Sequence, residues 1–424
     1  MIRQILDLHI HSRYSRACSR DLELPKIAQA CEKKGIDIIA TGDFTHPAWF
    51  SHLKENLKEI ADTGIFELKN KQSKTKFILG TEIACIKKHK DFCRRLHLCI
   101  FAPNLQIVEK FNNELEKNGF NLRSDGRPIL GMTAKELLIF IKKIDSRMQM
   151  IPAHIWTPWF GLFGSKSGYD SIEDCFEEMS SEIFALETGL SSDPLMNWHW
   201  SSLDKFSLVS NSDAHSLQKL GREANVFQFI NEQDINYNEI FSILKKRDKK
   251  KFLKTIEFYP EEGKYHFDGH KDCNFVCSPE ESLKYKNICP ICKKKLVLGV
   301  SNRLAELSDR GEKEIQNISK EKIPFQNLVP LIEIIADTLE KGVVSKIVLN
   351  TYENLLKNIG NEFYILLEAD LEKIKKIESE KIAEAIDRVR KGNIFVKPGY
   401  DGVFGIVKVF SDEKRKDKNL SLEL

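Results

Sequence analysis

The sequence has no apolar run that approaches the ~20 residues needed to span a bilayer. Its first residues, MIRQILDLHIHS, also lack the apolar core and the small-residue cleavage site of a secretory signal. The net charge is only +3, from 65 basic and 62 acidic residues, and this balance neither demands nor forbids a nucleic-acid partner. We therefore expect a cytoplasmic protein that makes no membrane contact.

Disorder is excluded as the main state, because 42% of the 424 residues are hydrophobic and 30% are charged. The length predicts two to three domains at roughly 150 residues each. Amphipathic patterns predict helices at 24–35 and 133–145, and Thr133 with Glu136 forms a capping box at the start of the second. Short apolar runs that end in turn signals predict buried strands at 38–43, 76–85, 96–103, 148–156, 183–189 and 206–213. Strands that alternate with helices predict a parallel α/β fold, and this many units favour a barrel.

Composition shifts divide the chain into three predicted segments. The α/β pattern covers 1–255 and ends near KKRDKKKFLK (245–254), which is either a solvated domain edge or a phosphate contact. A cysteine cluster lies within 256–300. Residues 301–424 are expected to be mainly helical, with a β-like, turn-rich patch around PGYDGVFG and a frayed end at 411–424.

Candidate metal ligands follow several of the predicted strands. Asp7, His9 and His11 alternate along DLHIH, so a strand would place them on one face. The other candidates sit where predicted strands end: Asp43, Glu82, His97, His154, Asp213 and His215. They converge if the strands are parallel and close into a barrel, since such barrels carry their active sites at that end.

Mixed imidazole and carboxylate ligands suit Zn, Mn or Fe. Several ions close together fit the hydrolysis of a phosphate ester by metal-activated water. A protein nucleophile is then unnecessary, and the sequence contains no Gly-x-Ser-x-Gly elbow or P-loop. Two further carboxylates, Glu187 and Asp193, lie on the expected active-site side. Each can orient a water or a metal, or can serve as a capping or turn residue.

Four of the ten cysteines form CNFVC and CPIC, with eleven residues between the pairs. This spacing predicts a closed structural zinc site of Cys273, Cys277, Cys289 and Cys292. His266 or His270 could replace one of the cysteines. The other six cysteines are expected to be small buried apolar residues.

The stretch IWTPWFGLFGSKSG (155–168) follows His154 and combines aromatic residues, glycines and a lysine. A flexible loop of this kind over a metal site can stack on exposed bases and contact phosphate, whereas the alternative is a loop packed on its neighbours. The predicted DNA contacts are Ser12, Arg13, Tyr14, Ser15, Arg16, Trp156, Trp159, Phe160 and Lys166. Trp198 and Trp200 are expected to be packing residues.

The ordered motifs DLHIHSRYS, TGD, GTE, LHL, PAH and NSDAH resemble the polymerase and histidinol phosphatase (PHP) superfamily over residues 1–255. This resemblance implies a distorted (β/α)7 barrel with two to three divalent ions, which we expect to be Zn, Mn or Mg. By position the ligands would be His9, His11, Asp43, Glu82, His97, His154, Asp213 and His215. The sequence departs from many members at Phe44, where they have His, and His46 could either reach back instead or be a surface residue.

The barrel, the cysteine module and the helical segment with PGYDGVFG together resemble the endonuclease Q family. The resemblance implies a prokaryotic DNA repair enzyme, associated with the nucleoid during repair. It would cut damaged DNA, single- or double-stranded, 5′ to uracil, hypoxanthine, xanthine and abasic sites, with Asp193 and Glu187 as catalytic candidates. The sliding clamp is a further partner in some members, and QNLVPLI (326–332) matches a clamp-binding peptide poorly and favours a helix start.

Two alternatives stay open. A phosphatase for a small phosphorylated metabolite would share the metal site but would not need the last ~170 residues. A binding module with a degenerate metal site would read DNA without cutting it, and the nearly complete ligand set argues against that interpretation.

Overall fold

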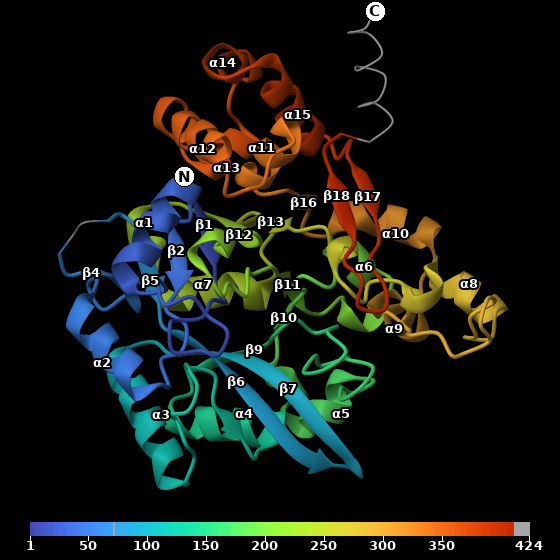
Figure 1. Ribbon diagram of the computed structural model, residues 1–424. Helices are drawn as coiled ribbons and strands as arrows, with labels where there is room; N and C mark the ends of the chain where they lie inside the picture. The colour runs from blue at the N-terminus through green and yellow to red at the C-terminus, as the bar shows by residue number, and fades with distance from the viewer. Residues whose placement is uncertain (71–72, 411–424) are drawn as a thin grey trace, which may run out of the picture. The chain divides into compact units, whose positions relative to one another are not determined.

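The computed structural model describes residues 1–70 and 73–410 of the chain (Figure 1). The chain divides into two compact units. The first contains residues 1–32, 36–256 and 303–325, and the second contains 33–35, 257–302 and 326–424. The predicted division at 255 and 300 stays a prediction, although residues 303–325 group with the first unit.

The strands form several hydrogen-bonded sheets. An eight-stranded sheet has the order β16-β13-β12-β1-β2-β5-β4-β3, and a four-stranded sheet has the order β8-β6-β7-β9. Parallel pairing joins β1 to β2, β2 to β5 and β10 to β11. The bounds are β1 Ile2–Asp7, β2 Ile38–Ala40, β3 Leu57–Glu59, β4 Ile65–Leu68, β5 Lys76–Ile78, β6 Gly80–His89, β7 Phe92–Phe101, β8 Ile129–Leu130, β9 Gln149–Pro152, β10 Ala185–Glu187, β11 Ser207–Val209, β12 Ala224–Phe229, β13 Phe252–Glu257, β14 Asp268–His270, β15 Phe275–Cys277, β16 Phe325–Asn327, β17 Phe395–Lys397 and β18 Ile406–Lys408.

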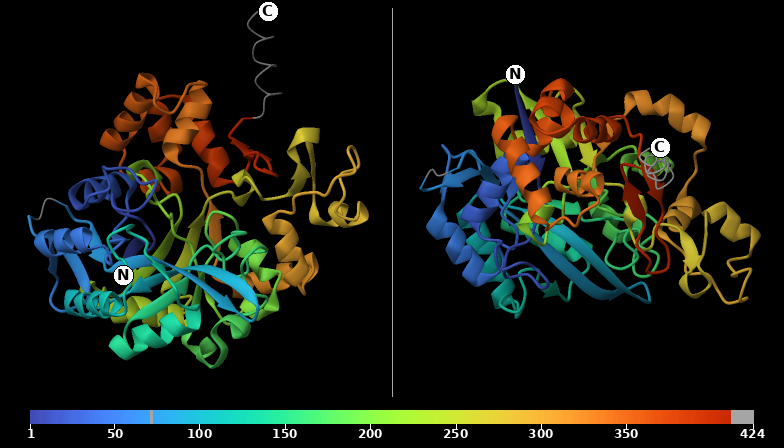
Figure 2. Two further views of the ribbon diagram at one scale, coloured as in Figure 1. Left: turned by 60° about the horizontal axis from the view of Figure 1, so that its bottom comes forward. Right: turned by 45° about the horizontal axis from the view of Figure 1, so that its top comes forward.

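Along the chain, the α-helices of the first unit alternate with these strands, as the sequence pattern predicts. Residues 303–325 contribute α10 and most of α9 to this unit. Helices α11–α15 follow one another in the second unit and gather into one helical body in both views of Figure 2. The bounds are α1 Leu24–Lys34, α2 Pro47–Asn56, α3 Leu105–Lys117, α4 Ala134–Ile144, α5 Ile172–Phe176, α6 Pro194–Trp198, α7 Tyr237–Lys246, α8 Pro279–Lys284, α9 Val300–Leu307, α10 Glu312–Ile318, α11 Leu331–Leu339, α12 Lys346–Asn358, α13 Glu362–Leu367, α14 Leu371–Ile377 and α15 Glu380–Arg390.

The predicted elements are largely confirmed. All six predicted strand segments contain a strand, and α1 and α4 match the two predicted helices. The capping box is present, because the Thr133 hydroxyl accepts from the backbone N–H of Glu136 and the Glu136 carboxylate accepts in return from that of Thr133. The helix start expected within QNLVPLI is also confirmed, because this segment runs from β16 into α11, which begins at Leu331.

Two expectations about the strands need correction. DLHIH is not a strand throughout, because β1 ends at Asp7 and only an isolated bridge, between Ile10 and Ala214, continues the pairing. Among the described residues the strands also fall into separate sheets with several antiparallel pairs, rather than one closed ring of parallel strands. The fold is α/β, and the long β6–β7 hairpin in Figure 1 accounts for much of the antiparallel pairing.

The core of the first unit is apolar and fully covered. Leu6, Ile38, Cys99, Ile151 and Val209 belong to one buried cluster contributed by five strands. Burying side chains of this kind supplies about 1.5–3 kcal/mol each, so the strand ends that carry polar residues are held firmly. No helix within residues 1–70 and 73–410 is both long and apolar enough to cross a membrane.

The second unit contains the cysteine module and the turn-rich patch. Strands β14 and β15 form a hairpin, and β17 and β18 form another that PGYDGVFG connects, which confirms the β-like patch. The predicted fraying of 411–424 lies outside the described residues. Of the six scattered cysteines, Cys93 is exposed and Cys18 half-buried, so only four fit the buried expectation.

Candidate metal centre

The first and last ligand motifs lie side by side. The backbone N–H of Leu8 donates to Asn211 Oδ1 at 2.8 Å, and that of His11 donates to Ala214 O at 3.1 Å. Asp7 anchors the same contact, because its carboxylate accepts from the backbone N–H of Ser212 and Gly221. Two segments about two hundred residues apart in sequence are thereby fixed in register, and their side chains share one buried space.

Glu82, near the start of β6, is the centre of the cluster and is fully buried. Its Oε1 lies 2.8 Å from His97 Nδ1 and 3.1 Å from His154 Nε2. Its Oε2 lies 3.2 Å from His11 Nε2 and 3.7 Å from His9 Nε2. One carboxylate therefore faces four imidazoles that come from three different parts of the chain.

Asp213 faces the same two histidines from the opposite segment. Its Oδ1 lies 3.2 Å from His11 Nε2 and 3.7 Å from His9 Nε2. The atoms of His9, His11, Glu82 and Asp213 thus form one group that could hold an ion, and Glu82, His97 and His154 form a second. Because Glu82 belongs to both groups, the donor set would suit more than one divalent ion.

Glu187, at the end of β10, is buried behind His9. Its two oxygens lie 3.1 and 3.0 Å from His9 Nδ1, and its Oε2 accepts from the backbone N–H of His154 at 2.8 Å. A carboxylate on the far nitrogen of a ligand imidazole fixes the ring and its tautomer. Glu187 therefore orients His9 so that Nε2 points at Glu82 and Asp213.

Asp43 performs the same task for His11. Its Oδ1 lies 3.0 Å from His11 Nδ1, while Oδ2 accepts from the backbone N–H and the hydroxyl of Ser12 and from the hydroxyl of Ser15. Among the described residues, neither Asp43 nor His215 belongs to a group of potential metal ligands. The ring of His215 lies 4.7 Å from that of His11, so it borders the cluster.

The cluster's electrostatics follow from burial and close charges. Burial disfavours a charged His11, but the carboxylates of Asp43, Asp213 and Glu82 outweigh it and hold the pKa of His11 well above its ordinary value. Burial lowers the pKa of His97 to about 4. His97 is therefore a neutral imidazole with a lone pair, which is the form that binds a metal.

The residues present fit a set of divalent ions. His9 Nε2, His11 Nε2 and Asp213 Oδ1 are buried and lack a hydrogen-bond partner among the described residues. Such orphaned atoms are costly unless something else binds them. Two ligand atoms on one tetrahedral zinc, each at ~2.1 Å from the ion, lie about 3.4 Å apart. His11 Nε2 lies at a similar distance, 3.2 Å, from Glu82 Oε2 and from Asp213 Oδ1.

Two members of the site were not predicted from the sequence. Arg127 donates from Nη1 to Glu82 Oε2 at 2.8 Å, and this carboxylate outweighs burial and raises the pKa of Arg127. Cys99 forms a third group with His9 and Glu187, and burial raises the pKa of its thiol to about 12. Nothing in NLRSDGRP distinguishes Arg127 from a surface arginine, whereas Cys99 lies two residues after His97 on β7 and so shares its face.

The loop that carries Arg127 packs closely on the first motif. Gly126 donates to Tyr14 O, and a Cβ at Gly126 would lie 2.4 Å from both Asp43 Oδ2 and Ser15 Oγ. Only glycine permits this approach. The guanidinium is thereby brought to the edge of the cluster, where its side chain is one-quarter exposed.

The predicted DNA contacts separate into accessible and inaccessible residues. Trp156 is buried and donates from Nε1 to Asn197 Oδ1, so its prediction as a stacking residue is wrong. Ser12 and Ser15 are buried and bind Asp43, which makes them supports of the cluster rather than phosphate contacts. The residues that remain accessible, at least in part, are Arg13, Tyr14, Arg16, Trp159, Phe160 and Lys166.

The loop 155–168 is compact. Phe163 N donates to Ile155 O at 2.8 Å, and a Cβ at Gly164 would lie 2.3 Å from Thr157 O. Phe160 packs on the ring of His97 at 4.2 Å, and the exposed Trp159 lies under the Arg95 guanidinium. Trp198 and Trp200 are buried against other aromatic rings, which confirms them as packing residues.

Asp193 and His46 have local roles in the structure. The Asp193 carboxylate caps α6 by accepting from the backbone N–H of Met196 at 2.9 Å. His46 precedes α2 and stacks on Tyr14 at 4.4 Å. Neither belongs to a group of potential metal ligands within the described residues.

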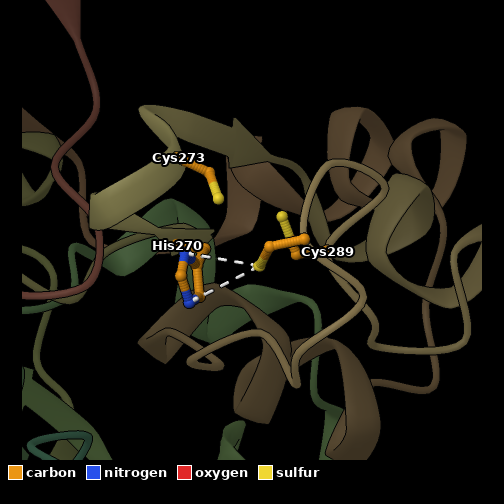
Figure 3. Close-up of side chains that lie close together, drawn as sticks. His270, Cys273 and Cys289 are labelled. Atoms are coloured by element: carbon orange, nitrogen blue, oxygen red, sulfur yellow. Dashed lines mark hydrogen bonds between the residues drawn. The ribbon is translucent and has the colours of Figure 1, made fainter.

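The cysteine module gathers three of its four cysteines around a histidine. His270, Cys273, Cys289 and Cys292 form one group, and Figure 3 shows the first three turned toward a common space. Cys292 Sγ lies 3.9 Å from His270 Nε2. In the β14–β15 hairpin Cys277 pairs with Asp268, two pairs beyond the His270–Phe275 pair, and packs on Cys289 and Leu296. Cys277 as the fourth ligand therefore stays a prediction, while in the group that the structure brings together His270 takes the fourth position.

Taken together, the buried imidazoles and carboxylates describe an α/β protein with a centre for several metal ions and a separate Cys3His group that suits one structural zinc. Comparison with known proteins defines the family. A solved structure of the lesion-specific endonuclease PfuEndoQ from Pyrococcus furiosus is 31% identical, with a TM-score of 0.83 over 98% of this chain and 99% of that one. The chain belongs to the endonuclease Q family.

Other relatives agree over different lengths. Endonuclease Q in complex with a 27-mer duplex with an abasic lesion is 32% identical, with a TM-score of 0.82 over 97% of this chain and 98% of that one. YqxK of Bacillus subtilis is 30% identical over 95% of this chain and 98% of its own. MJ0043 of Methanocaldococcus jannaschii is 35% identical over 59% of this chain, and the matched region covers only 31% of MJ0043. Residues 330–393 match the MJ0043 C-terminal domain family.

Proposed function

We propose that the chain is a DNA repair endonuclease that hydrolyses the phosphodiester bond on the 5′ side of deaminated bases and abasic sites. The deaminated bases would be uracil, hypoxanthine and xanthine. The observation that carries the proposal is the buried cluster around Glu82, present in a chain that resembles endonuclease Q over nearly its whole length. The solved complex with an abasic duplex supports damaged DNA as the substrate class.

The cluster would hold two to three divalent ions in a PHP-type site. His9, His11, Glu82 and Asp213 would hold one ion, Glu82, His97 and His154 a second, and His215 lies beside them. When bound, such ions supply Lewis acidity toward water and toward the phosphate oxygens. The chain itself supplies the placement, since Glu187 orients His9 and Asp43 orients His11.

Accessible residues beside the cluster would hold the strand. Tyr14 and Trp159 are exposed rings suited to stacking on a base that has left the duplex, and Arg13, Arg16 and Lys166 are exposed cations suited to phosphates. Arg127 would meet the phosphate nearest the ions, because a guanidinium binds phosphate and carboxylate with the same fork geometry.

The test is a cleavage assay on end-labelled duplexes. One duplex carries a uracil, one a hypoxanthine, one an abasic site and one no lesion, each with Mg²⁺, Mn²⁺ or Zn²⁺. We expect a single nick on the 5′ side of each lesion and none in the control duplex. No nick with any metal, together with rapid turnover of a small phosphomonoester, would favour the metabolite phosphatase instead.

Asp193 remains a proposed participant in hydrolysis, and an Asn substitution separates that role from capping. Asn caps a helix about as well as Asp, so Asp193→Asn should keep α6 and the melting temperature. If the carboxylate takes part in the reaction, this variant should cut at least about a hundredfold more slowly while it binds abasic DNA normally. Cutting at the normal rate would leave Asp193 with the cap alone.

A further inference from the structure

A cavity of about 410 Å³ lies in the first unit and shares no lining residue with the metal centre. It is bordered by α6, the start of β11, the end of α7 and residues 318–323. Its volume falls within the ~300–1,000 Å³ of pockets that take small organic ligands. The cavity is therefore large enough for a nucleotide-sized molecule.

One part of the wall of this cavity is apolar and partly aromatic. Trp198, Leu203 and Phe206 are buried side chains that line it, and Ile323 contributes from the opposite side. Trp198 is held in place by an edge-to-face contact with Phe325 at 5.5 Å. A fixed aromatic wall of this kind suits a flat heterocycle.

The rim is basic, and its cations differ in how they are paired. Lys322 binds the Asp204 carboxylate, and Arg247 donates to the Asp204 carbonyl. Lys246 and Lys249 also line the cavity and are exposed, and their side chains make no hydrogen bond or ion pair among the described residues. Two unpaired ammonium groups at the rim leave room for an anion.

The basic run 245–254 therefore contains two kinds of lysine. Lys246 and Lys249 line the cavity, whereas their neighbour Lys250 is exposed and does not line it. The carboxylate of Glu321 also lines the rim and opposes an anion there. A purely solvated domain edge would not concentrate unpaired cations beside an aromatic cavity.

We propose that this cavity binds one nucleotide unit, with the base against Trp198 and Phe206 and the phosphate at Lys246 and Lys249. The nucleotide can be free or part of a DNA strand, because both present the same base and phosphate. Binding here does not depend on cleavage at the metal centre, so the two proposals can fail separately.

Equilibrium binding on the full-length protein tests the site, with dAMP and a short lesion-free single strand as probes. Lys249→Glu should weaken binding about tenfold, since it replaces an attraction with a repulsion. Lys250→Glu is the matched control and should leave binding unchanged. Glu321→Lys should strengthen binding, which a loss of folding cannot mimic.

Saturable binding of dAMP would identify a free nucleotide as the ligand, and binding of the strand alone would identify a DNA subsite. Each result supports the proposal if the Lys249 and Lys250 variants differ. Equal effects of the two variants, or no saturable binding of either probe, would overturn it. Lesion cutting measured in parallel reports on the metal centre independently.

Discussion

Replacing His11 by alanine is expected to reduce lesion cutting by at least about a thousandfold, because its Nε2 lies between the two carboxylates that define the first ion group. The ring is fully buried and Asp43 fixes its other nitrogen, so no neighbouring side chain can take its position. Removing it also leaves Glu82 and Asp213 as facing carboxylates with one fewer cationic or metal partner. We therefore expect weaker metal binding as well as slower cutting.

The measurement combines single-turnover cutting of abasic DNA with metal content after dialysis. His52→Ala is the matched control, since His52 is a half-buried imidazole stacked on Trp49 and outside the cluster. If the His11 variant loses metal yet binds abasic DNA normally, its loss of cutting arises at the metal centre. Cutting by this variant at the rate of the His52 variant would exclude His11 from the reaction.

The convergence of the centre was predictable because its ligands follow strands. Glu82, His97 and His154 each lie in or just after an apolar run, and the α/β pattern requires these runs to meet in the core. The spacing in DLHIH placed His9 and His11 together even though β1 ends earlier than expected. Hydrophobic periodicity therefore sufficed to bring six of the eight predicted ligands into the two candidate metal groups without a correct barrel topology, while Asp43 and His215 fall outside them.

The remaining features depend on contacts that periodicity does not encode. Arg127 reaches Glu82 only because Gly126 allows its loop to approach Asp43, and nothing in the local sequence reports that approach. Trp156 follows a ligand directly, yet its indole turns inward to Asn197. Side-chain direction in irregular segments is set by tertiary packing, so the division between stacking and core aromatic residues required the structure.

The cysteine module gives the second large expected effect. We propose that His270, Cys273, Cys289 and Cys292 hold one structural zinc, so Cys289→Ala should lower the affinity for that ion by at least about a hundredfold. His270→Ala should act in the same direction. Structural zinc contributes directly to folding, so both variants should also unfold at a lower temperature.

Cys277→Ala distinguishes this ligand set from a four-cysteine site. Cys277 is buried on Leu296 and paired with Asp268, so its loss should cost about 1 kcal/mol of packing and leave the zinc in place. The measurement is zinc release to a chromophoric chelator, compared across the Cys277, Cys289 and His270 variants. If the Cys277 variant releases zinc as readily as the Cys289 variant while the His270 variant retains it, the fourth ligand is Cys277. The hairpin geometry argues for the opposite order, because His270 lies opposite Phe275 at the hairpin end that carries Cys273, and Cys277 lies two pairs further along.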